Sequence, residues 1–181
     1  MDRSQAYALV NEHLKTGNIV KHVIAVEAAM RAVAKRLGAD EDAWGLAGLL
    51  HDLDYEYTKD DPEKHAELTA EMLTAADLPA GVVDAILAHN RRRPADTPLD
   101  HALLAVDPAT GFIVAAALMT PGKSLADCDV GFLLKRFKEK RFAAGANRDQ
   151  IAGCSVLGLE LGEFLGLCLD GMRSRAAELG L

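Results

Sequence analysis

The sequence predicts an all-α protein, and three observations support this fold class. Residues that favour helices, above all Ala, Leu, Glu and Lys, dominate the 181 residues. No stretch alternates apolar and polar residues for long enough to predict a β-strand. Between Ile19 and Leu37, apolar side chains recur every three or four residues, which is the spacing of one helix face. Because half of the residues are hydrophobic and no linker divides the chain, we expect one domain with a full core.

Capping residues place the ends of the predicted helices. Gly38 ends the helix over residues 19–37, because glycine readily adopts the left-handed backbone that closes many helices. Asp40 and Asn147 are suited to begin helices, since their side chains accept hydrogen bonds from the first free amides. Pro62 fits the first position of another helix. The predicted helices cover residues 19–37, 40–53, 62–76, 80–90, 99–119, 130–137, 148–157 and 160–178.

The most apolar of these helices, over residues 99–119, contains Pro108 and Gly111 near its middle, and we expect them to perturb it. The longest apolar stretches carry Gly, Asp or Pro within about 18 residues, so they do not predict membrane spans, and no membrane partner is expected. The first residues lack a basic segment followed by an apolar run. We therefore expect no signal peptide and a cytoplasmic protein.

Charge and cysteine content argue against further classes of protein. The formal net charge is −7, so no nucleic-acid polymer is expected as a partner. Two basic clusters, at residues 91–93 and 135–141, stand apart from the acidic remainder. Such clusters serve an anionic small molecule or simply form a solvated surface. The three cysteines form no CxxC motif, so the sequence supports neither a disulfide framework nor a thiolate zinc site.

His51 and Asp52 are the most informative pair, because the apolar run over residues 46–50 delivers an imidazole and a carboxylate together. Burying such groups is costly unless something binds them, and a metal ion does so well. His22 lies on an apolar helix face, and Asp107 follows the apolar run LLAV. Taken singly, each residue also fits an ordinary buried histidine or a turn-capping aspartate. A structural helical protein with satisfied histidines is therefore an alternative.

The ordered set of histidines and aspartates resembles the HD-domain superfamily of metal-dependent phosphohydrolases. Members carry a helical His, a later His-Asp doublet and a distal Asp, and subgroups that bind two metals add two histidines. The matching positions are His22, His51, Asp52, His65, His89 and Asp107. The stretches DPATGFIVAAALMTP and KRFKEKRFAAGANRD resemble a bacterial group of predicted HD-domain hydrolases. The resemblance implies a single HD-domain helical bundle over residues 1–181, with a core of about 18–120 and C-terminal helices over 125–180 packed on it.

The resemblance implies a hydrolase that cleaves a phosphomonoester or phosphodiester of a small molecule, with a nucleotide as the expected substrate. Its cofactors would be one or two divalent ions of Mn, Fe, Co, Ni or Zn, held by the six matching residues, with Asp52 as the bridge. The alternative is a non-catalytic regulatory module that binds a metal or a nucleotide. The sequence does not fix the oligomeric state and leaves a homodimer open.

Residues near the doublet are candidates for the remaining roles. The candidate catalytic residues are Asp52, Asp54 and Glu56, although the last two equally fit a solvated acidic loop. Asp54 also departs from the pattern His-Asp-Ile-Gly-Lys of many two-metal members, because this chain has His-Asp-Leu-Asp-Tyr there. The candidates for binding a substrate phosphate are Arg91, Arg92 and Arg93.

Overall fold

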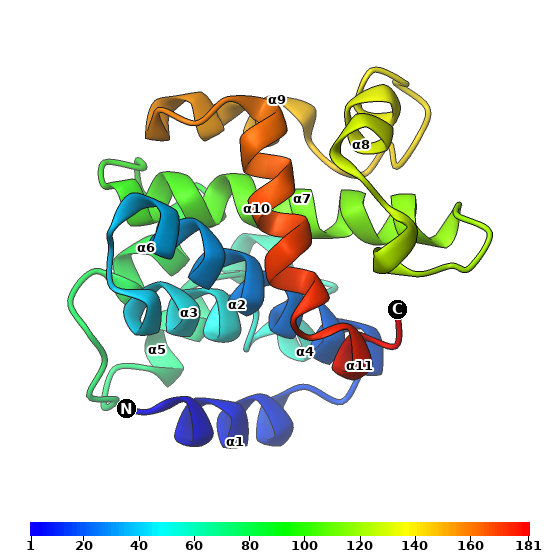
Figure 1. Cartoon of the computed structure of the whole chain (residues 1–181). Helices are drawn as coiled ribbons and strands as arrows, with labels where there is room; N and C mark the ends of the chain where they lie inside the picture. Colours follow the sequence, from blue (N-terminus) through cyan, green and yellow to red (C-terminus); the bar gives the residue numbers. More distant parts are fainter.

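The computed structural model describes all 181 residues as a bundle of helices without a β-strand, so the predicted fold class is confirmed (Figure 1). The α-helices are α1 (Arg3–His13), α2 (Gly17–Leu37), α3 (Glu41–Leu50), α4 (Tyr55–Thr58), α5 (Glu67–Met72), α6 (Val82–His89), α7 (Pro98–Leu118), α8 (Val130–Phe137), α9 (Arg148–Ala152), α10 (Leu161–Arg173) and α11 (Ala176–Leu179). Short 3-10 helices are η1 (Pro62–Lys64), η2 (Leu125–Asp127) and η3 (Gly153–Leu157). The two 21-residue helices, α2 and α7, contact each other in the core.

Two glycines bring α3 and α10 close to α2. A Cβ atom at Gly48 on α3 would lie 2.9 Å from the backbone nitrogen of Glu27. A Cβ atom at Gly171 on α10 would overlap the carbonyl group of Ala28. Both helices therefore pack with their backbones against the backbone of α2, and α10 also crosses α7 (Figure 1). This packing fixes the position of α2 relative to the end of α3.

Helix α7 continues through Pro108 as one helix, so the expected perturbation does not interrupt it. Buried side chains on both sides of the proline, including Val106 and Phe112, hold the helix against the core. By length and mean hydropathy α7 could cross a membrane, but a buried core helix has the same properties, and α2, α6 and α10 contact it here.

The segment between α3 and α6 departs most from the predicted helices. Helix α3 ends at Leu50, three residues earlier than expected, and residues 51–54 form turns. The helix predicted after Pro62 is split into η1 and α5, because Ala66 has a φ angle of 70°. The physical reason is tertiary: the Asp54 carboxylate accepts hydrogen bonds from the amide of Ala66 and from an amide of α5. A distant side chain therefore replaces the local helical partners of these amides.

The ends of the chain differ from the prediction as well. Helix α1 is not among the predicted helices, although a capping box between Asp2 and Gln5 begins it. The helix predicted over 160–178 is split into α10 and α11. At the break, the Ser174 hydroxyl donates a hydrogen bond to the Gly171 carbonyl, a local bond that competes with helix continuation. The helix predicted over 148–157 becomes α9 followed by η3.

Candidate metal centre

The structure brings the six predicted ligands together in one cluster, which we call the His–Asp cluster. Its members are His22 (on α2), His51 and Asp52 (after α3), His65 (after η1), His89 (the end of α6) and Asp107 (on α7). Two subsets have ligand atoms within 4.8 Å of one another: His22, His51 and Asp107, and His51, Asp52 and His89. The proximity expected from the sequence is thus present, and the role of each residue as a ligand stays a prediction.

One carboxylate, that of Asp52, faces the Nε2 atoms of all four histidines. Its Oδ1 atom lies 3.4 Å from Nε2 of His51, 3.3 Å from that of His65 and 3.7 Å from that of His89. Its Oδ2 atom lies 3.7 Å from Nε2 of His22. These separations are too long for most direct hydrogen bonds but leave room for a cation between the atoms.

Asp107 forms the second carboxylate of the cluster. Its Oδ1 atom lies 3.1 Å from Nε2 of His22 and 3.9 Å from Nε2 of His51. The Asp107 side chain is 33% exposed and that of His22 is 23% exposed, whereas that of His51 is fully buried. The cluster therefore opens to solvent on the side of α2 and α7, and also at His65, whose side chain is 23% exposed.

Backbone carbonyls set the proton positions of two histidines. Nδ1 of His51 lies 2.8 Å from the carbonyl oxygen of Gly48, and Nδ1 of His89 contacts the carbonyl oxygen of Ile86. A carbonyl oxygen only accepts hydrogen bonds, so Nδ1 carries the proton in both rings and Nε2 keeps its lone pair. Both lone pairs point into the cluster, and Nε2 of His51 is buried without a hydrogen-bond partner. Such an orphaned acceptor fits a bound cation.

Side chains hold the other two histidines in the same manner. Nδ1 of His65 donates to Oδ1 of Asp54 at 2.8 Å, which leaves Nε2 of His65 only 3.3 Å from Nε2 of His89. Two unprotonated nitrogens at this distance repel each other unless a positive charge lies between them. Nδ1 of His22 lies 3.4 Å from the hydroxyl of Thr110, a partner that the sequence did not single out. Neutral imidazoles with orienting partners, together with carboxylates, suit divalent transition metals.

Electrostatics keep the carboxylates of the cluster ionised. Burial acts to raise the pKa of Asp52, but His51, His89 and His22 overcome it and hold this pKa well below its usual value. Burial also acts against ionised Asp107, and the hydrogen bond from His22 prevails and lowers its pKa. For His51, burial lowers the pKa and favours the neutral ring. Burial acts to lower the pKa of His22 and His65, but the neighbouring carboxylates overcome it and raise both pKa values. The carboxylates therefore attract positive charge, which a bound cation would supply in place of protons.

The two other candidate catalytic carboxylates have their oxygens occupied. Asp54 is fully buried, and its Oδ2 atom accepts hydrogen bonds from the amides of Ala66 and Thr69 at 2.7 and 3.2 Å. Because Oδ1 accepts a hydrogen bond from Nδ1 of His65, the Asp54 carboxylate orients the His65 ring on the side that faces away from Asp52. Glu56 accepts a hydrogen bond from the amide of Thr16 at 2.6 Å and so connects α4 to the start of α2. A direct catalytic role for either residue stays a prediction, and the contacts favour positioning.

The arginines that follow α6 are held largely by other groups. Arg92 donates to the carbonyl of Pro62 at 2.8 Å and pairs with Glu63 at 3.3 Å, beside the loop that carries His65. The guanidinium of Arg93 lies 3.4 to 3.7 Å from the carboxylates of Asp84, Asp96 and Asp100. Arg91 is exposed. Phosphate binding by these arginines stays a prediction, and Arg92 is the member that contacts the His65 loop.

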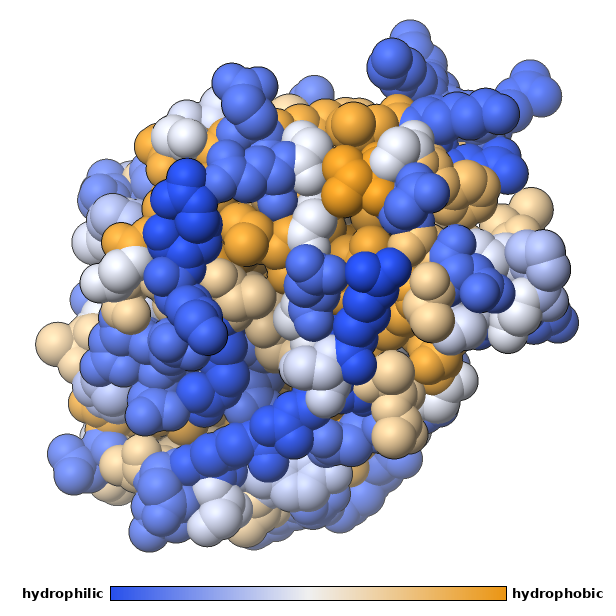
Figure 2. Space-filling view, in the orientation of Figure 1, coloured by the Kyte–Doolittle hydropathy of each residue, from blue (hydrophilic) through white to orange (hydrophobic).

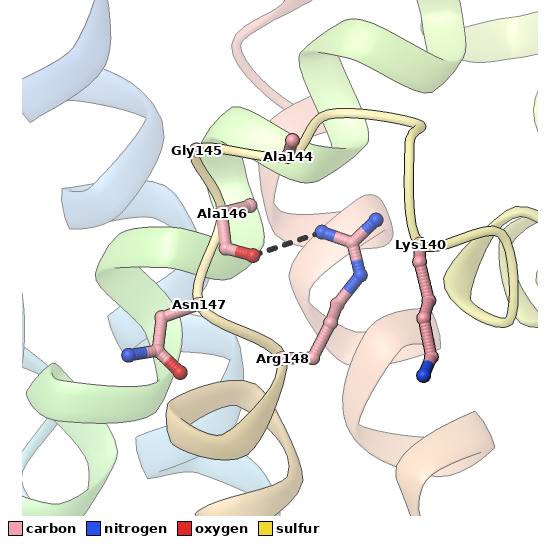
Figure 3. A pocket seen from close by; sticks show the side chains of 6 residues that line it. All are labelled: Lys140, Ala144, Gly145, Ala146, Asn147 and Arg148. Carbon is pink, nitrogen blue, oxygen red and sulfur yellow. Dashed lines mark hydrogen bonds between the residues drawn. The ribbon is translucent and has the colours of Figure 1, made fainter.

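A hollow of about 370 Å³ lies elsewhere, in the loop before α9 (Figure 3). Lys140 and Arg148 line it, but the Arg148 guanidinium is engaged by carbonyl oxygens, including those of Ala143 and Ala146 at 3.0 Å. This segment projects with α8 from the bundle in Figure 1, and hydrophilic residues cover the same corner in Figure 2. Its phenylalanines pack on Phe112, as expected for a structural segment. No candidate metal ligand lines this hollow.

Comparisons with known proteins match the part of the chain that carries the cluster. A family model described as HD domain matches residues 19–117, a range that contains all six members of the His–Asp cluster. Ribonuclease Y of Sulfurovum sp. (strain NBC37-1) is 32% identical over 90 residues, which are 50% of this chain and 18% of that protein. The chain thus spans less than a fifth of the length of this relative. No solved structure matches significantly.

Proposed function

Because the chain belongs to the HD domain family, whose members are generally metal-dependent hydrolases, we propose that it is a metal-dependent phosphohydrolase acting on a small phosphorylated molecule. The observation that carries this proposal is the convergence of four Nε2 atoms on the Asp52 carboxylate, with the Nε2 atom of His51 buried and unpartnered. A protein that used these histidines only for packing would satisfy this atom with a hydrogen bond.

The donor set supports one or two divalent ions. His22, His51 and Asp107 would hold one ion, and His65 and His89 would hold a second, with Asp52 as the ligand shared by both. When bound, such an ion supplies an activated water at neutral pH by lowering the pKa of that water. The residues around the ions keep the rings fixed: the Gly48 and Ile86 carbonyls and the Asp54 carboxylate present each lone pair to the centre.

The substrate classes to examine follow from the resemblance and from the relative. A nucleotide is the class that the HD-domain resemblance implies. The name of the Sulfurovum relative makes RNA a second class, although the negative net charge of this chain speaks against a large nucleic-acid surface. We place the protein in the cytoplasm, with a small phosphorylated molecule as its partner.

The test has two steps, metal content and then turnover. The purified protein is reconstituted with Mn, Fe, Co, Ni or Zn and analysed by elemental mass spectrometry, and about one or two ions per chain are expected. Release of phosphate or of ester products is then measured with nucleotides, other phosphoesters and RNA. Metal binding without any turnover would favour the regulatory module, and the absence of metal under all five conditions would refute the proposal.

A matched pair of variants links turnover to the cluster. Asp52→Asn keeps the shape of the side chain and should reduce turnover roughly a thousandfold or more, because several kcal/mol of metal-derived stabilisation would be lost. Asp60→Asn removes an exposed carboxylate eight residues away and should retain full activity. Equal activity of the two variants would place the catalytic site elsewhere.

A further inference from the structure

A groove of about 440 Å³ lies between α2, α7 and the residues that follow α11. The α2 wall includes Lys21 and His22, and the α7 wall includes Thr110, Gly111, Val114 and Leu118. Figure 1 shows the last residues of the chain beside the half of α7 that forms this wall. His22 belongs both to the groove and to the His–Asp cluster, so the two sites are continuous.

The helical register extends this continuity along α7. Gly111, Val114 and Leu118 follow Asp107 by four, seven and eleven residues, so all four positions lie on one face of the helix. A molecule bound along this face therefore has one end at the exposed carboxylate of Asp107. The opposite end lies at Leu118, which is 50% exposed.

The lining of the groove combines one free cation with apolar walls. Lys21 is exposed and forms no ion pair, and its Nζ atom lies beside Gly180, in the wall formed by the last residues of the chain. Away from His22 the walls are mainly aliphatic, with Val114, Leu118 and Leu181 among them. Two neutral polar side chains, Asn18 and Thr110, line the groove, and the Thr110 hydroxyl already donates to the Asp107 carbonyl at 2.9 Å. The groove thus offers little to the hydroxyl groups of a sugar or to the polar edge of a base.

We propose that this groove binds the organic part of the substrate and that the substrate is a phosphomonoester of an apolar alcohol. The phosphate lies at the cluster, and the apolar chain lies along Val114 and Leu118. The assignment rests on the proposed function, because the metal centre holds the phosphate end. The proposed substrate therefore differs from the nucleotide that the family resemblance implies, because its organic group is largely aliphatic.

Gly111 keeps the middle of the groove open. A Cβ atom at this position would have no neighbour within 4 Å, so larger side chains fit without displacing the backbone. Glycine in the middle of a helix lowers stability relative to other residues, and α7 carries it where the groove passes. Gly111→Leu therefore fills the groove while the helix is retained, which gives the proposal a specific test.

The experiment measures the binding of non-hydrolysable methyl-, butyl- and octylphosphonate to the metal-loaded protein by isothermal titration calorimetry. Each methylene group that enters the groove should tighten binding roughly threefold to fourfold. Three such groups separate butylphosphonate from methylphosphonate, so butylphosphonate should bind roughly 30- to 60-fold more tightly. Gly111→Leu should abolish this gain while methylphosphonate binds as before.

The outcomes separate this inference from the proposed function. Equal affinity for the three phosphonates, or full chain-length dependence in Gly111→Leu, would overturn the groove assignment and leave the phosphohydrolase proposal intact. If a nucleoside monophosphate bound more tightly than octylphosphonate, and Gly111→Leu removed this difference, the apolar substrate class would also be overturned. Failure of metal-loaded protein to bind methylphosphonate would instead contradict the phosphate site itself. Circular dichroism checks that Gly111→Leu is folded. Leu118→Gln, at the exposed far end of the groove, provides a second variant, which should weaken octylphosphonate and leave methyl- and butylphosphonate unchanged.

Discussion

Replacing Asp54 by asparagine should switch His65 to the wrong tautomer for binding a metal. In the structure, Oδ2 of Asp54 accepts two backbone amides and Oδ1 accepts the Nδ1 hydrogen of His65. In Asp54→Asn, the single amide oxygen satisfies the two backbone amides, so the NH₂ group faces Nδ1 of His65. Nδ1 must then accept, and the ring proton moves to Nε2, which faces Asp52.

The expected losses of metal affinity and of stability follow from the contacts that Asp54→Asn changes. Loss of an orienting partner behind a metal-bound histidine lowers metal affinity roughly 10- to 100-fold. The fold loses about 1–3 kcal/mol, because neutral hydrogen bonds replace charge-assisted ones. Asp54→Ala should cost more, about 2–6 kcal/mol, because the amides of Ala66 and Thr69 would both lose their buried acceptor.

The assay is a competition titration with a metal-sensitive chelator, combined with urea unfolding of the metal-free protein. Asp60→Asn, at an exposed position nearby, is the control and should behave as the wild type in both measurements. If Asp54→Asn bound every ion with wild-type affinity, the Asp54 carboxylate would not set the tautomer of His65. The positioning role drawn from its contacts would then be wrong.

Other changes test the packing and the metal centre. Glu27→Ala should destabilise the protein by about 1–3 kcal/mol in urea unfolding, because the partly exposed Arg3 and Arg31 lose their buried carboxylate and only Arg31 keeps a second partner, Asp42. An unchanged midpoint would contradict this network. Gly171→Ala should lower the free energy of unfolding by about 1–3 kcal/mol, because the new methyl group overlaps α2. Gly111→Ala should raise it by about 0.5–1 kcal/mol, because this position is open and glycine disfavours a helix. Thermal melts that reversed the two signs would refute the packing argument. Burial raises the pKa of the Cys154 thiol to about 11, so Ellman's reagent at pH 8 should leave it unmodified in the native protein and modify it in urea.

Apolar helical segments indicated His22, His51, Asp52 and Asp107 in the sequence, whereas His65 and His89 were added by the resemblance to two-metal HD domains. His22 and Asp107 are placed by α2 and α7, whose patterns are strong, and His51 follows the buried helix α3. The loop with His65 was predicted as continuous helix, since no local pattern reveals that the Asp54 carboxylate captures the amide of Ala66.

The orienting contacts could not be predicted for a related reason. Backbone carbonyls hold His51 and His89, and every residue has such a carbonyl, so sequence carries no signal for them. Asp54 was singled out as a departure from the family pattern, but its burial and its bond to His65 depend on the tertiary fold. The groove between α2 and α7 likewise depends on helix packing.

Gly48 links two properties that are usually treated separately. Its missing side chain lets α3 touch the backbone of α2, and its carbonyl holds the ring of His51. The ligand geometry is therefore complete only when these two helices are packed together. An ion that binds the native state and not the unfolded chain then shifts the unfolding equilibrium toward the native state. At a free metal concentration 100 times the Kd, this linkage adds about 2.7 kcal/mol to stability. The melting temperature of the protein would then serve as a gauge of how much metal the surrounding solution supplies.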